Sequence, residues 1–235
     1  MPRNKGRTAS AGERILRREV VRVCRRLYEQ GLIAGAEGNV SARLPNGHIL
    51  ITPAGVAKTD VRQGDLVVLD PSTLRVAGAG RASSELGMHL RVYERRPDVR
   101  AVVHAHPPLA TAFGVAGEDL MDAVLPEIVL LTGGVPLVPY ATPGSAALAD
   151  AIEPFLEQHD AFLMANHGAT ALGPTLSAAH ARMESLEHAA RILLAARMLG
   201  RVNSLTSEQR DEVLSIRADV KRNVSAPRNR GRGRS

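Results

Sequence analysis

The sequence predicts a single α/β or α+β sandwich, in which one β-sheet is covered by helices. Segments typical of strands and of amphipathic helices are mixed along the chain, and several neighbouring strand segments are placed to pair in antiparallel fashion. No internal repeat or linker separates them. With 44% hydrophobic and 23% charged residues among 235, the chain has enough apolar surface to fold as one domain. Together these observations favour one sheet between helices.

The first helix has clear start and stop signals. Ser10 and Glu13 form a capping box, and apolar residues follow at helical spacing over residues 16–27. Gly31 is placed to end the helix. The Asn46-Gly47 pair then predicts a tight hairpin.

The remaining elements follow from similar patterns. Ser83 is the first residue of an expected helix at 83–95, and Pro97 lies just beyond its end. The expected strands are 39–44, 48–52, 65–70, 99–106 and 161–165, the apolar segments without an assigned type are 125–131 and 135–138, and the further expected helices are 145–156, 174–199 and 206–222.

Charge is distributed unevenly along the chain. The net charge is +6, but residues 1–26 and 217–235 are strongly basic, whereas residues 27–216 are acidic overall. A nucleic-acid-binding domain usually shows a basic face with stacking aromatic residues, and aromatic residues are only 3% here. We therefore expect no specific nucleic-acid partner. We expect a disordered basic N-terminus at 1–9, one domain at 10–222 and a disordered basic tail at 223–235.

Other features predict a cytoplasmic protein. No apolar stretch is long enough to span a membrane, and no secretory signal is recognisable at the start. The lone Cys24 excludes an intrachain disulfide and is expected to be a small apolar filler in a reduced compartment.

Three histidines are candidate metal ligands. His104 and His106 stand two residues apart at the end of an expected strand, so both side chains should point to the same face. His167 ends another apolar strand and could complete a three-ligand site with one open position. Unrelated surface or edge histidines are the alternative. We expect the other histidines to be structural or solvated, and they are His48, His89, His159, His180 and His188.

Several loops have the composition of a phosphate site. Ser83, Ser84 and Glu85 begin a helix, where free N–H groups and hydroxyls can bind an anion and a carboxylate can act as acid or base. The Gly38-Asn39 and 52–55 loops could grasp the same phosphate. Simple helix capping and turn formation explain the same residues equally well.

In this order, the strings GNVS, ITPAG, SSE, VVHAHP, PYATPG and NHG resemble the class II aldolase and adducin head family over about residues 10–200. The resemblance implies a three-layer α/β/α sandwich with a mainly antiparallel central sheet, and a homotetramer with active sites at subunit interfaces. It implies Zn²⁺ bound by His104, His106 and His167, with Glu85 as acid/base and as a ligand when substrate is absent. The residues that it assigns to phosphate binding are Gly38, Asn39, Gly55, Ser83 and Ser84.

The implied reaction is cleavage of a ketose 1-phosphate, of the L-fuculose or 5-deoxyribulose type, to dihydroxyacetone phosphate and an aldehyde. Three departures from the fuculose aldolase pattern leave the identity of the substrate less closely defined. Ala54 replaces a threonine, Glu127 stands where fuculose aldolases carry a tyrosine, and no tyrosine follows Tyr140 in the sequence. Glu127 resembles a second acid/base of methylthioribulose-1-phosphate dehydratases; an exposed charge is the alternative. Pentulose-phosphate 4-epimerases, sugar-acid phosphate decarboxylases and an adducin-like scaffold are the other family activities considered.

Overall fold

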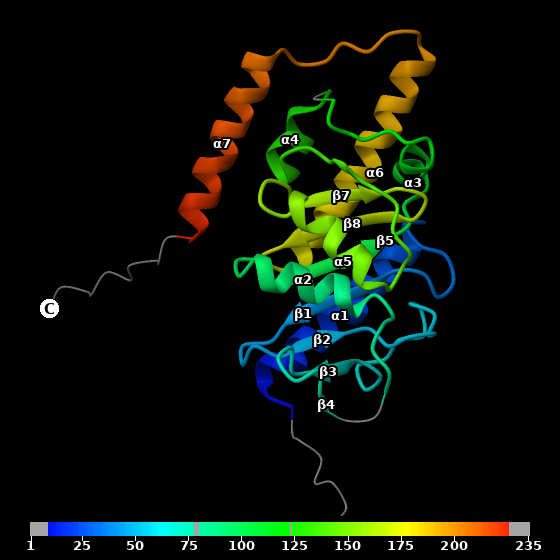
Figure 1. Cartoon of the computed structure of the whole chain (residues 1–235), viewed down its shortest axis with the longest axis vertical. Coiled ribbons are helices and arrows are strands. Elements are labelled where there is room, and N and C mark those ends of the chain that lie inside the picture. The colour runs from blue at the N-terminus through cyan, green and yellow to red at the C-terminus, as the bar shows by residue number, and fades with distance from the viewer. Residues whose placement is uncertain (1–8, 78–79, 123, 226–235) are drawn as a thin grey trace, which may run out of the picture.

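A computed structural model describes residues 9–77, 80–122 and 124–225. Figure 1 shows a twisted sheet with helices against it. The strands are β1 (Asn39–Arg43), β2 (Ile49–Ile51), β3 (Val67–Leu69), β4 (Val76–Ala77), β5 (Ala101–Ala105), β6 (Leu137–Val138), β7 (Ala161–Met164) and β8 (Gly168–Gly173). The helices are α1 (Ala11–Glu29), α2 (Leu86–Arg95), α3 (Pro108–Val115), α4 (Pro126–Thr132), α5 (Ala146–Ile152), the short 3-10 helix η1 (Glu153–Phe155), α6 (Leu176–Met198) and α7 (Ser207–Ser225).

The described strands form one sheet in the order β4-β3-β2-β1-β5-β8-β7-β6. The sheet is mixed, which corrects the expectation of a mainly antiparallel one. β5 pairs antiparallel with both β1 and β8, but β6 at the edge runs parallel to β7. The chain from β6 to β7 passes through α5 and η1, and such a crossover brings the second strand back in the same direction.

Helices cover both faces of the sheet, as the sandwich prediction requires. Alternate residues of β5 enter different cores, because side chains alternate along a strand. Val103 packs in the core that α1, α3, α4 and α6 share, whereas Val102 packs in the core that α2 and α5 share. The sheet therefore forms the middle of three layers.

Local signals in the sequence explain how the first elements form. The Ser10 side chain accepts a hydrogen bond from the Glu13 N–H at 3.1 Å, which is half of the predicted capping box. Gly31 has a φ of +68° just after α1, and Gly47 has a φ of +84° in the β1–β2 turn. The predicted helix at 83–95 begins later, at Leu86, with Glu85 as its N-cap. The apolar segment at 125–131, whose type the sequence left open, lies largely in helix α4, with Leu125 as the N-cap.

Helix α7 extends further than the predicted 206–222 segment and packs against α4. Its residues 223–225 belong to the expected disordered tail but are helical. Arg217 belongs to the strongly basic 217–235 segment, but it is buried in contact with the body. The rest of the two expected disordered termini, 1–8 and 226–235, lies outside the described residues. Among the helices that are described, none combines the length and apolar character needed to cross a membrane.

Candidate metal centre and active site

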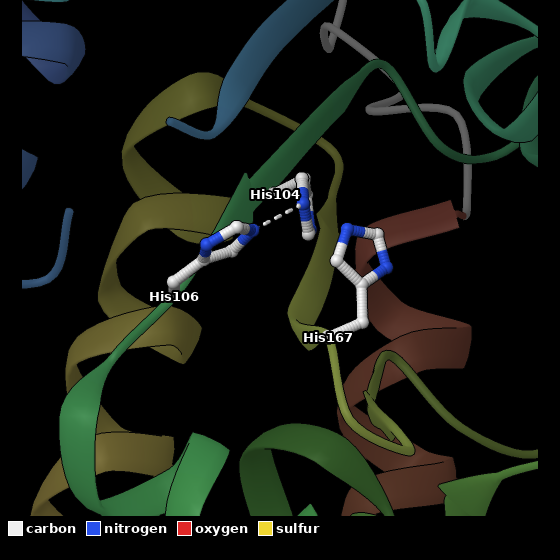
Figure 2. Close-up of side chains that lie close together, drawn as sticks. All are labelled: His104, His106 and His167. Carbon is white, nitrogen blue, oxygen red and sulfur yellow. Dashed lines mark hydrogen bonds between the residues drawn. The ribbon is translucent and has the colours of Figure 1, made fainter. Parts of the chain in front are cut away.

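Three strand ends bring the candidate ligands together. His104 belongs to β5, His106 follows that strand directly, and His167 lies in the tight β7–β8 turn, beside Asn166 with its left-handed φ of +55°. One ring nitrogen from each histidine lies within 4.8 Å of the others, and the three rings converge (Figure 2). The structure therefore brings together the three histidines that the sequence singled out.

Glu85 joins this cluster from the start of α2. Its Oε2 lies 3.2 Å from His104 Nε2, and its Oε1 lies 3.1 Å from His167 Nε2. The Asn39 amide donates a hydrogen bond to Glu85 Oε2 at 2.6 Å. Burial would raise the pKa of Glu85, but the hydrogen bond from the Asn39 amide and the other polar contacts of the cluster hold it well below its usual range. Glu85 is therefore a carboxylate at neutral pH.

The donor set fits a divalent metal ion. Burial lowers the pKa of His104 to about 3, so its imidazole is neutral with one ring proton. Its Nδ1 lies 2.9 Å from the Ala169 carbonyl and donates that proton, which leaves a lone pair on Nε2. This lone pair faces the Glu85 carboxylate and lies 3.2 Å from His106 Nε2. Glu85 Oε1 is also buried without a hydrogen-bond donor. A cation among these atoms would remove the repulsion between them.

Two glycines make room for the cluster. A Cβ on Gly168 would lie 2.6 Å from both the Ala105 carbonyl oxygen and His106 Cδ2. A Cβ on Gly38 would lie 2.7 Å from the His104 carbonyl oxygen, and Gly38 also has a φ of +69°. Side chains at these positions would displace the histidines, which gives a physical reason for the GNVS and NHG strings.

A buried chain of hydrogen bonds positions Asn39. His89 Nε2 lies 2.5 Å from Asn39 Oδ1, and Ser41 Oγ lies 2.6 Å from His89 Nδ1 and 2.8 Å from the Tyr93 hydroxyl. Burial lowers the pKa of His89 to about 4, so a neutral ring can donate to Asn39 and accept from Ser41. Our interpretation of His89 as merely structural or solvated missed this chain. The spacing of Glu85, His89 and Tyr93, four residues apart on one helix face, was the available signal.

A cavity of about 310 Å³ opens beside the cluster. The Pro53 and Ala82 backbones form a bridge that holds two of its loops together, and the Ser83 N–H donates to the Thr52 carbonyl. The lining includes all the predicted phosphate-binding residues, Gly38, Asn39, Gly55, Ser83 and Ser84, together with Glu85, His106 and His167. The phosphate loops and the candidate metal ligands therefore border one space.

Lys58 also lines this cavity and was not predicted. Its ammonium group donates to the Ala36 and Val56 carbonyls at 2.8 and 3.1 Å, so it ties the two loops that carry Gly38 and Gly55. Burial lowers the pKa of Lys58. Its ammonium group therefore lies beside the space where an anion would bind. The sequence around Lys58 is that of an ordinary loop and gave no sign of this position.

Glu127 lies elsewhere. It is an exposed residue in the first turn of α4 and does not line the cavity. Within the described part of a single chain, the structure does not bring it to the histidine cluster. A catalytic role for Glu127 stays a prediction.

The sequence matches a family model described as the Class II Aldolase and Adducin N-terminal domain, over residues 18–194. The chain is 34% identical over 192 residues to a 3-oxo-tetronate 4-phosphate decarboxylase of Escherichia coli, covering 77% of this chain and 87% of that protein. It is 33% identical over 174 residues to an L-fuculose phosphate aldolase of Methanococcus maripaludis, covering 74% and 93%.

Solved structures give the same picture. An L-fuculose 1-phosphate aldolase superposes with a TM-score of 0.81 at 30% identity, covering 88% of this chain and 97% of that one. YgbL of Escherichia coli, described as an aldolase, epimerase or decarboxylase, superposes with a TM-score of 0.80 at 30% identity, covering 86% and 98%. Both similarities span most of the sheet and its helices.

Proposed function

This chain belongs to the class II aldolase and adducin family, and from that premise we propose that it is a metal-dependent lyase that breaks a carbon–carbon bond next to the ketone of a phosphorylated sugar. The observation that carries the proposal is the convergence of His104, His106 and His167 with the Glu85 carboxylate at the edge of a cavity of about 310 Å³. This combination supports an enzyme rather than a scaffold.

His104, His106 and His167 would hold the metal, and Zn²⁺ is our proposal because three neutral imidazoles are its usual catalytic ligand set. A metal at this position would polarise the substrate ketone and stabilise the negative charge that develops on its oxygen. The remaining chemistry belongs to the side chains and backbone of the cavity.

The loops around the cavity would bind the phosphate group. Ser83 and Ser84 offer hydroxyls, the Gly38 and Gly55 loops offer backbone N–H groups, and the Lys58 cation lies beside them. A phosphate held here would direct the ketone toward the histidines and Glu85. This arrangement supports a substrate whose phosphate is attached one carbon from the ketone.

Glu85 would move the proton. When the bond between C3 and C4 of a ketose 1-phosphate breaks, its electron pair passes to C3 and the ketone oxygen, and the C4 hydroxyl loses its proton as the aldehyde forms. C3 must then receive a proton to give dihydroxyacetone phosphate. Glu85 lies among the three histidines at the cavity wall, which is the place for this transfer.

A second candidate is decarboxylation of a 3-oxo sugar acid phosphate. There the departing group is carbon dioxide, so no hydroxyl proton has to be removed from it. The resemblance places Glu127 where fuculose aldolases carry a tyrosine, and this departure loosens the match to an enzyme that releases an aldehyde. The similarity to decarboxylases of 3-oxo-tetronate 4-phosphate also supports it. Both reactions pass through the same enediolate and give the same phosphorylated product.

Phosphorus NMR can separate the two reactions. The metal-loaded protein would be incubated with fuculose 1-phosphate, 5-deoxyribulose 1-phosphate, methylthioribulose 1-phosphate or 3-oxo-tetronate 4-phosphate, with and without a chelator. A chelator-sensitive dihydroxyacetone phosphate signal supports the lyase, and trapping of an aldehyde or of carbon dioxide tells which bond partner leaves. A changed ketose phosphate signal without dihydroxyacetone phosphate would overturn it in favour of dehydration or epimerisation.

The assembly and the location of the protein remain part of the same proposal. The homotetramer with interface active sites follows from the family resemblance. Glu127 lies outside this cavity, so a second chain would have to supply the residues on the aldehyde side of the site. Any role for Glu127 would be in the site of a neighbouring chain. We propose a cytoplasmic location on the basis of the single, buried Cys24.

A further inference from the structure

Glu37 is a carboxylate at the wall of the catalytic cavity that the proposed reaction does not employ. It directly precedes Gly38, and its Oε2 lies 3.4 Å from His106 Nδ1. Its side chain is 48% exposed, and no lysine or arginine pairs with it in the part of the chain that the structure describes. The ionisable side chain that it contacts there is therefore the imidazole of His106.

The backbone holds Glu37 beside His106. The Ala34 N–H donates a hydrogen bond to Glu37 Oε2 at 3.3 Å, and the Glu37 N–H donates to the Ala34 carbonyl at 3.1 Å. The same loop is joined to the end of β5, because the His106 N–H donates to the Leu32 carbonyl at 3.0 Å. The carboxylate and the imidazole thus keep their relative positions although the Glu37 side chain is half exposed.

The position of one proton decides whether His106 can bind a metal. A histidine that binds a metal is neutral, so it has one proton for its two ring nitrogens. His106 Nε2 lies 3.2 Å from His104 Nε2, a contact that Figure 2 marks. A proton on His106 Nε2 would be donated to the lone pair of His104 and would occupy the space for a metal. A proton on Nδ1 faces Glu37 instead and leaves the Nε2 lone pair free.

His104 has the arrangement that His106 needs. Its Nδ1 donates to the Ala169 carbonyl at 2.9 Å, and its Nε2 points toward the cluster. Glu37 stands in the same relation to His106, with a carboxylate in place of the carbonyl. Histidines that bind metals commonly donate their other ring N–H to a carboxylate or a backbone carbonyl, which fixes the tautomer and the ring orientation.

We propose that Glu37 is a positioning residue for the metal centre, because its carboxylate accepts the Nδ1 proton of His106 and so keeps Nε2 free to bind the metal. This inference rests on the metal-dependent function proposed above. A carboxylate in this position also makes the imidazole a more basic ligand, which strengthens metal binding. Glu37 would therefore act on the metal through His106. An exposed carboxylate that only makes a weak surface contact is the alternative.

Metal affinity tests the proposal without any substrate. In Glu37→Ala, we expect the affinity for Zn²⁺ to fall by about 10- to 100-fold, measured by competition with a chromogenic chelator. Glu37→Gln keeps an acceptor oxygen without the charge, so its loss should be smaller. Glu184→Ala is the matched control, because Glu184 lies 2.9 Å from His180 Nδ1, and His180 is not one of the clustered histidines. Equal affinity in Glu37→Ala and the unaltered protein would overturn the proposal.

The tautomer of His106 is a second readout, which a merely structural contact would not change. Long-range ¹H–¹⁵N spectra of the metal-free protein show which ring nitrogen has the proton, and His106→Gln identifies the signal. We expect the proton on Nδ1 in the unaltered protein and on Nε2 in Glu37→Ala, where it can be donated to His104. A proton on Nε2 in the unaltered protein would contradict the proposal. Thermal unfolding checks that each variant is folded.

These readouts distinguish the role of Glu37 from the proposed reaction. If Glu37→Ala binds Zn²⁺ less tightly but the unaltered protein cleaves no phosphorylated sugar, the proposed function fails and the role of Glu37 stands. If the unaltered protein is active and Glu37→Ala keeps full metal affinity, the role of Glu37 alone fails. If the unaltered protein does not bind Zn²⁺, both fail.

Discussion

Glu85 depends on its neighbours for both its charge and its orientation. Asn39 donates to its Oε2, which His104 also approaches, and His167 approaches its Oε1. Asn39 is itself held by His89. The carboxylate is therefore aimed into the cluster by residues that are buried or nearly so, which is the preorganisation that proton transfer requires.

Replacing Glu85→Gln tests its role in proton transfer. The amide has almost the same shape but cannot carry the proton, so we expect the turnover rate to fall by about 10² to 10⁴. Steady-state kinetics would measure the loss, with circular dichroism to check the fold. Glu94→Gln is the control, because Glu94 is an exposed carboxylate on the same helix. An unchanged rate in Glu85→Gln would mean that Glu85 acts only as a negative charge at the start of the helix.

His89 makes the stability of the protein depend on pH. Its pKa is 6.5 in an ordinary environment and is lowered by burial to about 4. The folded state therefore binds fewer protons than the unfolded state between these values. The stabilisation from keeping His89 neutral is fully present above pH 6.5 and is lost as pH falls toward 4, by up to about 3 kcal/mol.

Urea unfolding of the metal-loaded protein at a series of pH values would measure this dependence. In His89→Gln, the fall in unfolding free energy between pH 6.5 and 4 should be shallower by about that amount. If both proteins lose stability in parallel, His89 does not carry the effect.

At the scale of elements, the sheet brings the site together. The register pairs His104 of β5 with Asn39 of β1 on one side and with Thr170 of β8 on the other. His167 enters through the β7–β8 turn, and Gly168 allows β8 to pass close to His106. Strand pairing thus fixes His104 directly and holds His106 and His167 close to strand ends.

Gly168→Ala tests this close approach. The new Cβ would meet the Ala105 carbonyl oxygen and His106 Cδ2 at 2.6 Å, so His106 must move. We expect metal affinity to fall by about 10- to 100-fold, measured by competition with a chromogenic chelator. Gly64→Ala is the control, because its Cβ would meet nothing within 4 Å. Equal affinity in both variants would show that the site tolerates the shift.

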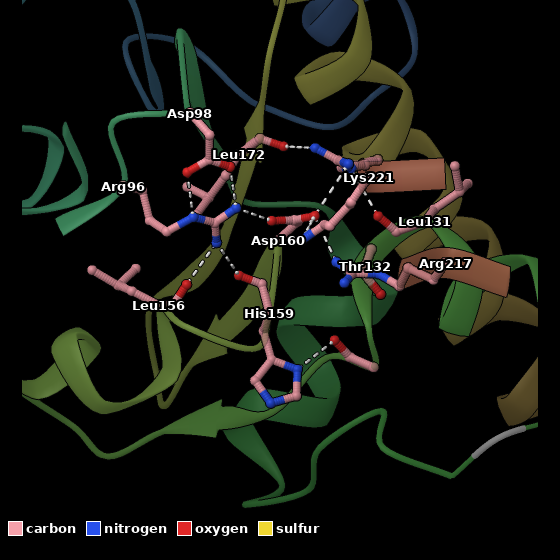
Figure 3. A network of polar contacts seen from close by, with 12 residues as sticks. Arg96, Asp98, Leu131, Thr132, Leu156, His159, Asp160, Leu172, Arg217 and Lys221 are labelled. Carbon is pink, nitrogen blue, oxygen red and sulfur yellow. Dashed lines mark hydrogen bonds and ion pairs between the residues drawn. The ribbon is translucent and has the colours of Figure 1, made fainter. Parts of the chain in front are cut away.

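The buried Asp160 is the equivalent anchor for α7, because Arg217 and Lys221 of that helix pair with its carboxylate (Figure 3). Asp160→Asn leaves four cations around a neutral group, and we expect the unfolding free energy to fall by about 3–5 kcal/mol. Because the pKa of Asp160 is lowered by its cations, this stabilisation is present above the ordinary value of 3.8 and is lost as pH falls below it. Urea unfolding at pH 7 would measure the loss, with the exposed Asp219→Asn as control. A loss as small as that of the control would mean that the cations find other partners.

The sequence identified some elements more readily than others. The capping box before α1 and the Asn-Gly turn are local signals, and both correspond to observed structure. β8 was missed because its sequence is GATALG, in which glycine and alanine give little strand pattern. The parallel pairing of β6 was missed because two residues, Leu137 and Val138, carry no information about direction.

The residues of the site also differ in how readily the sequence identified them. The three histidines and Glu85 could be selected because metal ligands and acid/base groups are few in type and stood at strand or helix ends. Lys58 could not be recognised in the same way, since its importance depends on which loops fold against it. The spacing of His89 from Glu85 was a signal, but it did not reveal that His89 contacts Asn39. Long-range contacts of this kind appear only in the folded chain.

At the scale of the whole molecule, the basic residues are concentrated near the two ends of the chain, and the body between them is acidic overall. The basic residues of α7 include Arg217 and Lys221, which contact the body through Asp160 instead of remaining free in solvent. The acidic body holds the histidine cluster and the cavity beside it. Family membership, the fold and the geometry of the site thus agree on a lyase-type enzyme.

The most direct test of this account is a metal titration of the stripped protein, followed by phosphorus NMR with the best phosphorylated substrate. Turnover should be absent without metal, rise in proportion to added Zn²⁺ and reach its limit at one equivalent per chain, while His104→Ala should bind no metal and show no turnover. Full turnover by the stripped protein, or an active His104→Ala variant, would contradict a metal-dependent lyase centred on the three histidines.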